Sequence, residues 1–284
     1  MKIRYFLIPL VLLLSSYAES TLAKGTLKGP YRIDSQVLGY ELQYWVYLPE
    51  RVEKPLPELY VTDGNAFLAA GRLEDVLDRA TAKGTIEPFA VILVDSRDPD
   101  FPEQSRRNRE FMCNVDYAKF YVGELMPEVS RLWTGAGPET PRGVMGVSFG
   151  AINSACFGMM LPGVFQTVVM LSPGSDKHLE VIDRQYRERP VNSSSFLVTN
   201  GGPEDNQEAA EQFVQTLRDK GYDVQHVATG GAHEWDDWRP LLDDLYRAFS
   251  QPEIWTTFPD TIPALEALRA ARLPLALVSN WDRR

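Results

Sequence analysis

A serine set between two glycines is the feature of this sequence best suited to chemistry. Residues 146–150 read Gly-Val-Ser-Phe-Gly, a G-x-S-x-G pattern in which a sharp turn from strand to helix lifts a serine hydroxyl toward a base. The residues before it, 141–145, are typical of a short buried strand, and the small apolar residues 151–160 predict a helix. This context predicts Ser148 as a nucleophile for acyl transfer, against the alternative of an ordinary serine in a glycine-rich turn.

Acyl transfer by serine needs a base, and the sequence offers three histidines. His226 alternates inside a predicted strand, and His178 lies in a polar stretch. His233 lies in a glycine-rich loop that follows the last predicted strand. Catalytic groups in open α/β sheets gather at such carboxyl ends of strands. We therefore predict His233 as the base.

The remaining groups of such a site are an acid that orients the histidine and two N–H groups that bind an oxyanion. Glu204 and Asp205 follow a predicted strand that ends near residue 199, which gives the chain order serine, acid, histidine. We favour Asp205 as the acid and leave Glu204 open. The oxyanion donors are expected to be the backbone N–H of Phe149 and that of Asn65, which follows an early strand.

The elements that must position these residues alternate between strands and helices. Strands are predicted at 31–38, 40–48, 59–62, 89–94, 141–145, 167–171, 195–199 and 224–228, and helices at 73–82, 117–132 (with a kink at Pro127), 151–160 and 209–220. This alternation predicts an α/β fold, a mainly parallel sheet with helices on both faces. Residues 175–195 leave no room for a large lid, so we expect an open cleft.

Composition narrows the possible partners. The chain has 284 residues, of which 44% are hydrophobic, enough for one sizeable core. A formal net charge of −10 argues against a nucleic-acid partner, which needs a basic face. The spacing of cysteines and histidines fits no metal site, so we predict neither a metal nor an organic cofactor. Cys156 on the predicted helix favours a buried free thiol, with a Cys113–Cys156 disulfide as the alternative.

The first 23 residues predict a signal peptide. Lys2 and Arg4 precede an apolar run at 6–14, and small residues extend to Ala23. We expect cleavage near Ala23, a periplasmic or secreted protein, and no stable membrane insertion afterwards. An uncleaved anchor is the alternative.

Four ordered stretches, 59–64, 106–111, 143–151 and 230–235, resemble the esterase family of α/β hydrolases. That family includes enterochelin (siderophore) esterases, the esterase D group, feruloyl esterases and mycolyltransferases. The resemblance covers residues 30–250. It implies an α/β-hydrolase fold with Ser148 and His233 as the catalytic pair, and it supports Asp205.

The resemblance also implies a substrate, a siderophore trilactone of the enterobactin type or another bulky ester. Arg106, Arg107 and Arg109 would then face an anionic or catecholate group, and we take Arg109 as the substrate-binding residue among them. Trp235 is expected to line the cleft beside His233.

The last residues, 251–284, differ from what precedes them. They resemble the middle of a haloacid-dehalogenase-type hydrolase, in which Ser279 would match a small hydroxyl after the second core strand. No Asp-x-Asp motif precedes them and no acidic metal motif follows, so the fragment lacks the groups that a phosphatase needs. We expect a truncated, non-functional segment packed loosely on an esterase domain at 24–250.

Together these features predict an exported serine hydrolase of carboxylic esters, acting on a small-molecule ester through an acyl-enzyme. An acyltransferase of the same fold and a non-catalytic binding module are the alternatives.

Overall fold

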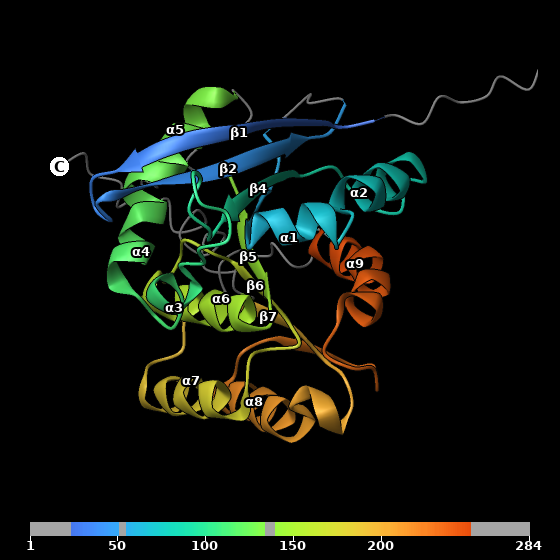
Figure 1. The fold of residues 1–284 in the computed structure, drawn as a ribbon. Coiled ribbons are helices and arrows are strands. Elements are labelled where there is room, and N and C mark those ends of the chain that lie inside the picture. The colour runs from blue at the N-terminus through green and yellow to red at the C-terminus, as the bar shows by residue number, and fades with distance from the viewer. Residues whose placement is uncertain (1–23, 51–54, 134–139, 251–284) are drawn as a thin grey trace, which may run out of the picture.

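The computed structural model describes residues 24–50, 55–133 and 140–250. Eight strands in these residues form one sheet of order β1-β2-β4-β3-β5-β6-β7-β8 (Figure 1). β1 (Thr26–Ser35) and β2 (Tyr40–Leu48) form an antiparallel hairpin, and β2 also pairs antiparallel with β4 (Ala90–Asp95). From β4 to β8 all neighbours are parallel. The predicted mainly parallel α/β sheet is therefore confirmed.

The central strands read as apolar runs because they are covered on both faces. Every residue of β4 is buried, as is every residue of β3 (Glu58–Thr62), β5 (Arg142–Val147) and β6 (Thr167–Leu171). β7 (Ser195–Asn200) is buried beyond its first residue, whereas β8 (Val224–Ala228) forms the more exposed far edge.

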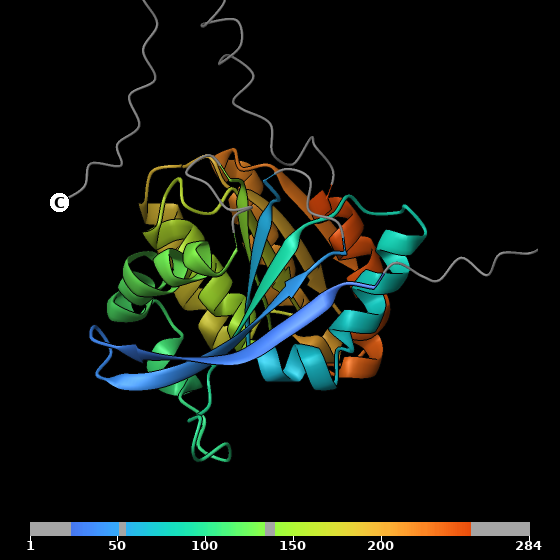
Figure 2. The ribbon, with the colours of Figure 1, turned by 90° about the horizontal axis from the view of Figure 1, so that it is seen from above.

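Helices cover the two faces of the sheet, as seen from above in Figure 2. One face carries α4 (Val115–Phe120), a π-helical turn (Tyr121–Leu125), α5 (Met126–Leu132), α6 (Phe149–Met160), α7 (Asp176–Glu188) and α8 (Gln207–Lys220). The other carries α1 (Gly64–Ala69), α2 (Leu73–Ala82) and α9 (Trp235–Ser250). The short helix α3 (Arg107–Glu110) follows β4 in the chain.

Several elements differ from the sequence-based expectation. The helix predicted at 117–132 is interrupted by the π-helical turn just before Pro127, whose ring nitrogen has no N–H for a helical hydrogen bond. Helices α7 and α9 were not predicted. α7 buries Leu179, Ile182 and Tyr186 in the core, so residues 176–188 pack on the sheet and form no lid.

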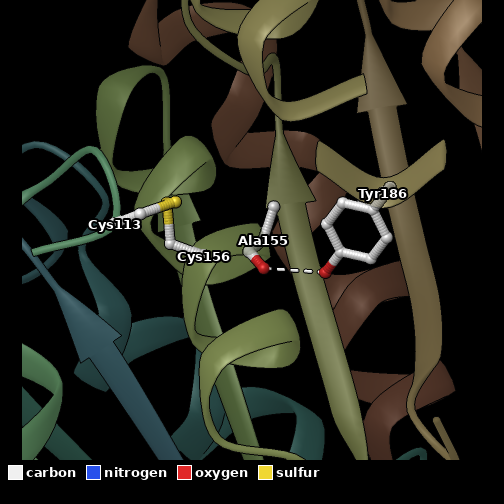
Figure 3. The surroundings of a disulfide bond; sticks show 4 residues. All are labelled: Cys113, Ala155, Cys156 and Tyr186. Atoms are coloured by element: carbon white, nitrogen blue, oxygen red, sulfur yellow. Dashed lines mark hydrogen bonds between the residues drawn. A yellow bond between two sulfur atoms is a disulfide. The ribbon is translucent and has the colours of Figure 1, made fainter. Parts of the chain in front are cut away.

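The prediction of a free thiol at Cys156 was wrong. Cys113 and Cys156 form a disulfide, with 4.8 Å between their Cα atoms (Figure 3). Cys113 lies in a left-handed turn after α3, with φ 61°, and that turn brings it against α6. Next to Cys156 in α6, the carbonyl of Ala155 accepts a 2.7 Å hydrogen bond from the hydroxyl of Tyr186 in α7.

The expected signal peptide at 1–23 and the expected haloacid-dehalogenase-like fragment at 251–284 lie outside the described residues, and both remain predictions. Within the described ranges, no helix is both long enough and apolar enough to cross a membrane.

Candidate active site

Ser148 lies on a tight turn between β5 and α6. Its backbone has φ 57° and ψ −123°, a conformation that non-glycine residues seldom adopt and that is typical of functional sites. The turn is possible only because two neighbours are glycines. A Cβ on Gly146 would lie 2.2 Å from the backbone of Gly150, and a Cβ on Gly150 would lie 2.7 Å from the Thr62 hydroxyl. The glycines of the pattern thus let the elbow pack against the end of β3.

His233 bridges Ser148 and Asp205. Its Nε2 lies 2.8 Å from the Ser148 hydroxyl oxygen, and its Nδ1 contacts a carboxylate oxygen of Asp205. Asp205 is 1% exposed, and its second oxygen accepts a 2.5 Å hydrogen bond from the N–H of Gly201. Asp205 is therefore the acid that meets the histidine, whereas Glu204 is exposed. The predicted serine, acid and histidine are brought together in one chain of contacts.

Two loops at the carboxyl ends of β7 and β8 hold the acid and the histidine. The N–H of Gly202 donates to the carbonyl of Gly231 at 2.7 Å, and the N–H of Thr229 donates to the carbonyl of Asn200 at 2.8 Å. A Cβ on Gly201 would lie 2.2 Å from the Gly231 carbonyl oxygen, so the loops touch through their backbones. These backbone hydrogen bonds and contacts between the two loops hold His233 in position relative to Asp205.

The other two histidines do not contact Ser148. His226 lies in β8, and its Nε2 is 2.6 Å from the side-chain oxygen of Asn200 in β7. The His178 ring stacks on Phe149 at 4.6 Å between centroids, and its Nδ1 lies 3.0 Å from the Ser175 hydroxyl. His233 is therefore the histidine placed to act on the serine.

The two expected oxyanion donors are first-turn N–H groups. Phe149 is the first residue of α6 and Asn65 is the second residue of α1. The first N–H groups of a helix have no intrahelical acceptor and remain available. Further along the first turns, the N–H of Ala66 donates to the carbonyl of Asp63 at 2.8 Å and the N–H of Ala151 donates to that of Ser148 at 3.0 Å. Asn65 and Ser148 line the same pocket.

That pocket has a volume of about 310 Å³. It lies at the carboxyl ends of the parallel strands and is walled by residues from five short stretches of the chain. Its lining residues are Asp63, Asn65, Ala66, Ser96, Arg97, Ser105, Arg107, Val147, Ser148, His233, Trp235 and Trp238.

Trp235 lines the pocket, as expected, and packs edge-on against Phe67 at 5.2 Å. The assignment of Arg109 needs correction. Its guanidinium lies over the Tyr40 ring, 4.5 Å from the centroid, and it is not among the lining residues. Arg107 lines the pocket instead, because residues two apart on a helix point to opposite sides.

Two arginines in the wall are held by buried carboxylates. Arg97 forms a bidentate pair with the fully buried Asp95. Arg107 lies 3.1 Å from the carboxylate of Asp63, which also accepts a 2.7 Å hydrogen bond from the Ser96 hydroxyl. Burial raises the pKa of Asp63, while the charge of Arg107 opposes that shift.

Sequence reasoning missed Ser96 and Arg97, and it assigned no role to Asp63. A signal was present, since Asp63 and the run 95–97 each directly follow a predicted buried strand. Carboxyl ends of neighbouring parallel strands meet at one edge of the sheet, where ligands bind. For metals, the described residues contain no group of three or more His, Cys, Asp or Glu side chains that would hold an ion.

Comparison with known proteins shows what this chain is similar to. Uncharacterized protein YjcH of Bacillus subtilis is 27% identical over 227 residues, which cover 73% of this chain and 91% of that protein. An endo-1,4-beta-xylanase/feruloyl esterase of Xylanibacter ruminicola is 24% identical over 213 residues, 70% of this chain but 28% of that protein.

Among solved structures, the enterobactin esterase FES from Shigella flexneri superposes with a TM-score of 0.69 at 20% identity, covering 81% of this chain and 60% of that one. This likeness shows that the two share a fold. The family model described as "Putative esterase" matches residues 35–249, so the chain belongs to this esterase family of carboxylic ester hydrolases.

Proposed function

We propose that this protein is an exported serine esterase that uses Ser148, His233 and Asp205 as a catalytic triad. The single observation that carries the proposal is His233, which reaches the Ser148 hydroxyl at 2.8 Å with one ring nitrogen and the buried Asp205 with the other. This is the arrangement in which a histidine removes the proton of a serine hydroxyl while a carboxylate orients the ring.

The first half of the reaction makes an acyl-enzyme. The Ser148 oxygen attacks the ester carbonyl carbon as its proton moves to Nε2 of His233. The carbonyl oxygen becomes an oxyanion that accepts hydrogen bonds from the N–H groups of Phe149 and Asn65. His233 then gives the proton to the leaving alcohol as the bond between carbon and the alcohol oxygen breaks.

In the second half, water replaces the alcohol. His233 takes a proton from the water, whose oxygen attacks the acyl carbon, and the proton then returns to Ser148 as the acid is released. Asp205 stays ionised throughout and stabilises the histidine when it is protonated. The steps use groups of this chain, the ester and one water molecule.

The substrate proposed is a bulky ester. Two observations support it: α7 packs on the sheet and does not cap the pocket, and the superposed Shigella protein is named an enterobactin esterase. The feruloyl esterase relative supports an aromatic acyl group as a second member of the same class.

A periplasmic or secreted location is also part of the proposal. The signal-like residues 1–23 support it. The Cys113–Cys156 disulfide supports it as well, because such bonds form and persist mainly in oxidising compartments.

Intact-mass detection of labelling by a fluorophosphonate tests the triad. Wild type should gain one label, and Ser148→Ala should gain none. His233→Ala should hydrolyse a p-nitrophenyl ester at least about 10⁴-fold more slowly, whereas the matched variant His226→Ala should stay within about twofold. A panel with a siderophore trilactone and a feruloyl ester then gives the substrate. A folded wild type that takes up no label would refute the proposal.

A further inference from the structure

We propose that Asp63 is a positioning residue, clamped by Ser96 and Arg107, that sets the spacing between the two N–H groups of the oxyanion hole. The inference rests on the proposed function. Asp63 and Arg107 have no step in the reaction above, yet both line the pocket beside Ser148.

The backbone of Asp63 starts the helix that carries one oxyanion donor. Asp63 has a left-handed conformation, φ 56° and ψ 42°, and its carbonyl accepts the N–H groups of Ala66 and Phe67. Asn65 is two residues further on, inside this turn. Any shift of Asp63 therefore moves the N–H of Asn65 with it.

The side chain of Asp63 does not stabilise its own helix. An aspartate at a helix N-cap usually accepts a hydrogen bond from the helix backbone, but here the side chain makes no such bond. It turns instead toward the loop directly after β4, where Ser96 donates to it at 2.7 Å, and toward α3, where Arg107 lies 3.1 Å away. The carboxylate thus joins three elements that are distant in the chain.

The same carboxylate contacts the helix that carries the second donor. A Cβ on Gly150 would lie 3.1 Å from an Asp63 carboxylate oxygen, so the side chain rests on the first turn of α6. Gly150 directly follows Phe149, whose N–H is the other donor. Asp63 is therefore in contact with both halves of the oxyanion hole.

Arg107 reaches both halves as well. Its guanidinium carbon lies 5.9 Å from the centroid of the Phe149 ring, and its segment is tied to α6 by the Cys113–Cys156 disulfide. It also neutralises Asp63, whose negative charge would otherwise act against a developing oxyanion in the same pocket. The ion pair of Asp63 and Arg107 can therefore hold the two N–H donors in place without adding net charge to the pocket.

Burying the carboxylate of Asp63 costs folding free energy, which a role in placing the donors would explain. The residue is 6% exposed, and one of its carboxylate oxygens has an ion-pair contact but no hydrogen bond. Buried charged pairs often contribute little to stability compared with apolar residues of similar volume. A role in placing the donors accounts for a charged pair at this position.

The test is a double-mutant cycle of Asp63→Asn, Arg107→Gln and the two combined, measured as kcat and KM on a p-nitrophenyl ester. Each single change should lower kcat about 10- to 100-fold, because a small displacement of an oxyanion donor has an effect of this order. KM should change less than about threefold. The combined variant should be no slower than the slower single variant, since both changes remove the same interaction.

Binding of phenylboronic acid supplies a readout that a general loss of stability would not move. This compound forms a tetrahedral adduct on an activated serine, so its affinity should fall by the same factor as kcat. Arg107→Lys keeps the charge and should recover part of the loss. Arg109→Gln is the matched control from the same helix and should stay within about twofold, because its side chain faces Tyr40.

Single variants that keep the wild-type kcat, losses that multiply in the combined variant, or a loss confined to KM would each overturn the inference. Failure of the proposed function gives a different result, namely a wild type that takes up no fluorophosphonate. If Asp63→Asn does not fold, the half-exposed Arg107 still decides the matter through its Gln and Lys variants.

Discussion

Reduction of the Cys113–Cys156 disulfide should lower the free energy of unfolding by an amount set by the length of the loop that the disulfide closes. The bond closes a loop with a sequence separation of 43 residues. In the chain-entropy model, releasing a loop of this length costs about 4 kcal/mol of unfolding free energy at 25 °C. The tether also joins the turn after α3 to α6, so its loss loosens the wall that carries Arg107 next to the serine.

Urea unfolding of the wild type with and without dithiothreitol measures this effect without any substitution. With a slope of about 2.5 kcal/mol per molar urea, the midpoint should fall by roughly 1.5 M on reduction. Cys113→Ala/Cys156→Ala should unfold near the reduced wild type and should not respond to dithiothreitol. Equal midpoints for oxidised and reduced wild type, or two alkylated thiols in unreduced denatured protein, would refute the reasoning.

Three further predictions concern single side chains. Asp205→Asn should lower kcat by about 10⁴, because it favours the wrong histidine tautomer, whereas Glu204→Gln should stay within about twofold in the same ester assay. Burial raises the pKa of Glu110 to about 8. The folded protein therefore holds a proton that the unfolded chain releases above pH ~4.5, so unfolding free energy should fall as pH rises from ~4.5 to ~8. Glu110→Gln should make that fall smaller in urea titrations at several pH values, and the part that remains comes from other buried carboxyls with raised pKa values, such as Asp63. Gly150→Ala places a Cβ 2.7 Å from the Thr62 hydroxyl and should cost roughly 1–3 kcal/mol of unfolding free energy, read from the same titrations; an unchanged midpoint would contradict the close packing.

Local pattern was sufficient for most of the sheet. The strand at Tyr40–Leu48 alternates and ends before a proline, and the strands at Thr167–Leu171 and Val224–Ala228 have the bounds predicted for them. The helix at Leu73–Ala82 also has its predicted bounds. These elements follow from side-chain periodicity within a few residues, which a sequence displays directly.

The helix α9 shows where local pattern was insufficient. It begins at Trp235, immediately after the histidine loop, and contains Pro240. Trp235 was predicted as a pocket-lining residue and does line the pocket, but it is also the first residue of a helix that covers the sheet. Neighbouring strands, which the sequence does not place, provide the apolar surface that stabilises it.

Local sequence patterns were enough to predict the candidate residues in their chain order, with Ser148 at the turn after one strand, a carboxylate after the strand that ends near residue 200, and His233 after the last strand. They were enough because each residue lies beside a recognisable strand end. Three choices needed the packed structure: Asp205 rather than Glu204 against the histidine, Arg107 rather than Arg109 in the pocket wall, and a disulfide rather than a free thiol. In the first two choices, residues of the same chemical type lie one or two positions apart. The disulfide depends on two distant segments of the chain coming together. Such choices are made by which side chain points inward when loops and helices pack, and no local pattern records that direction.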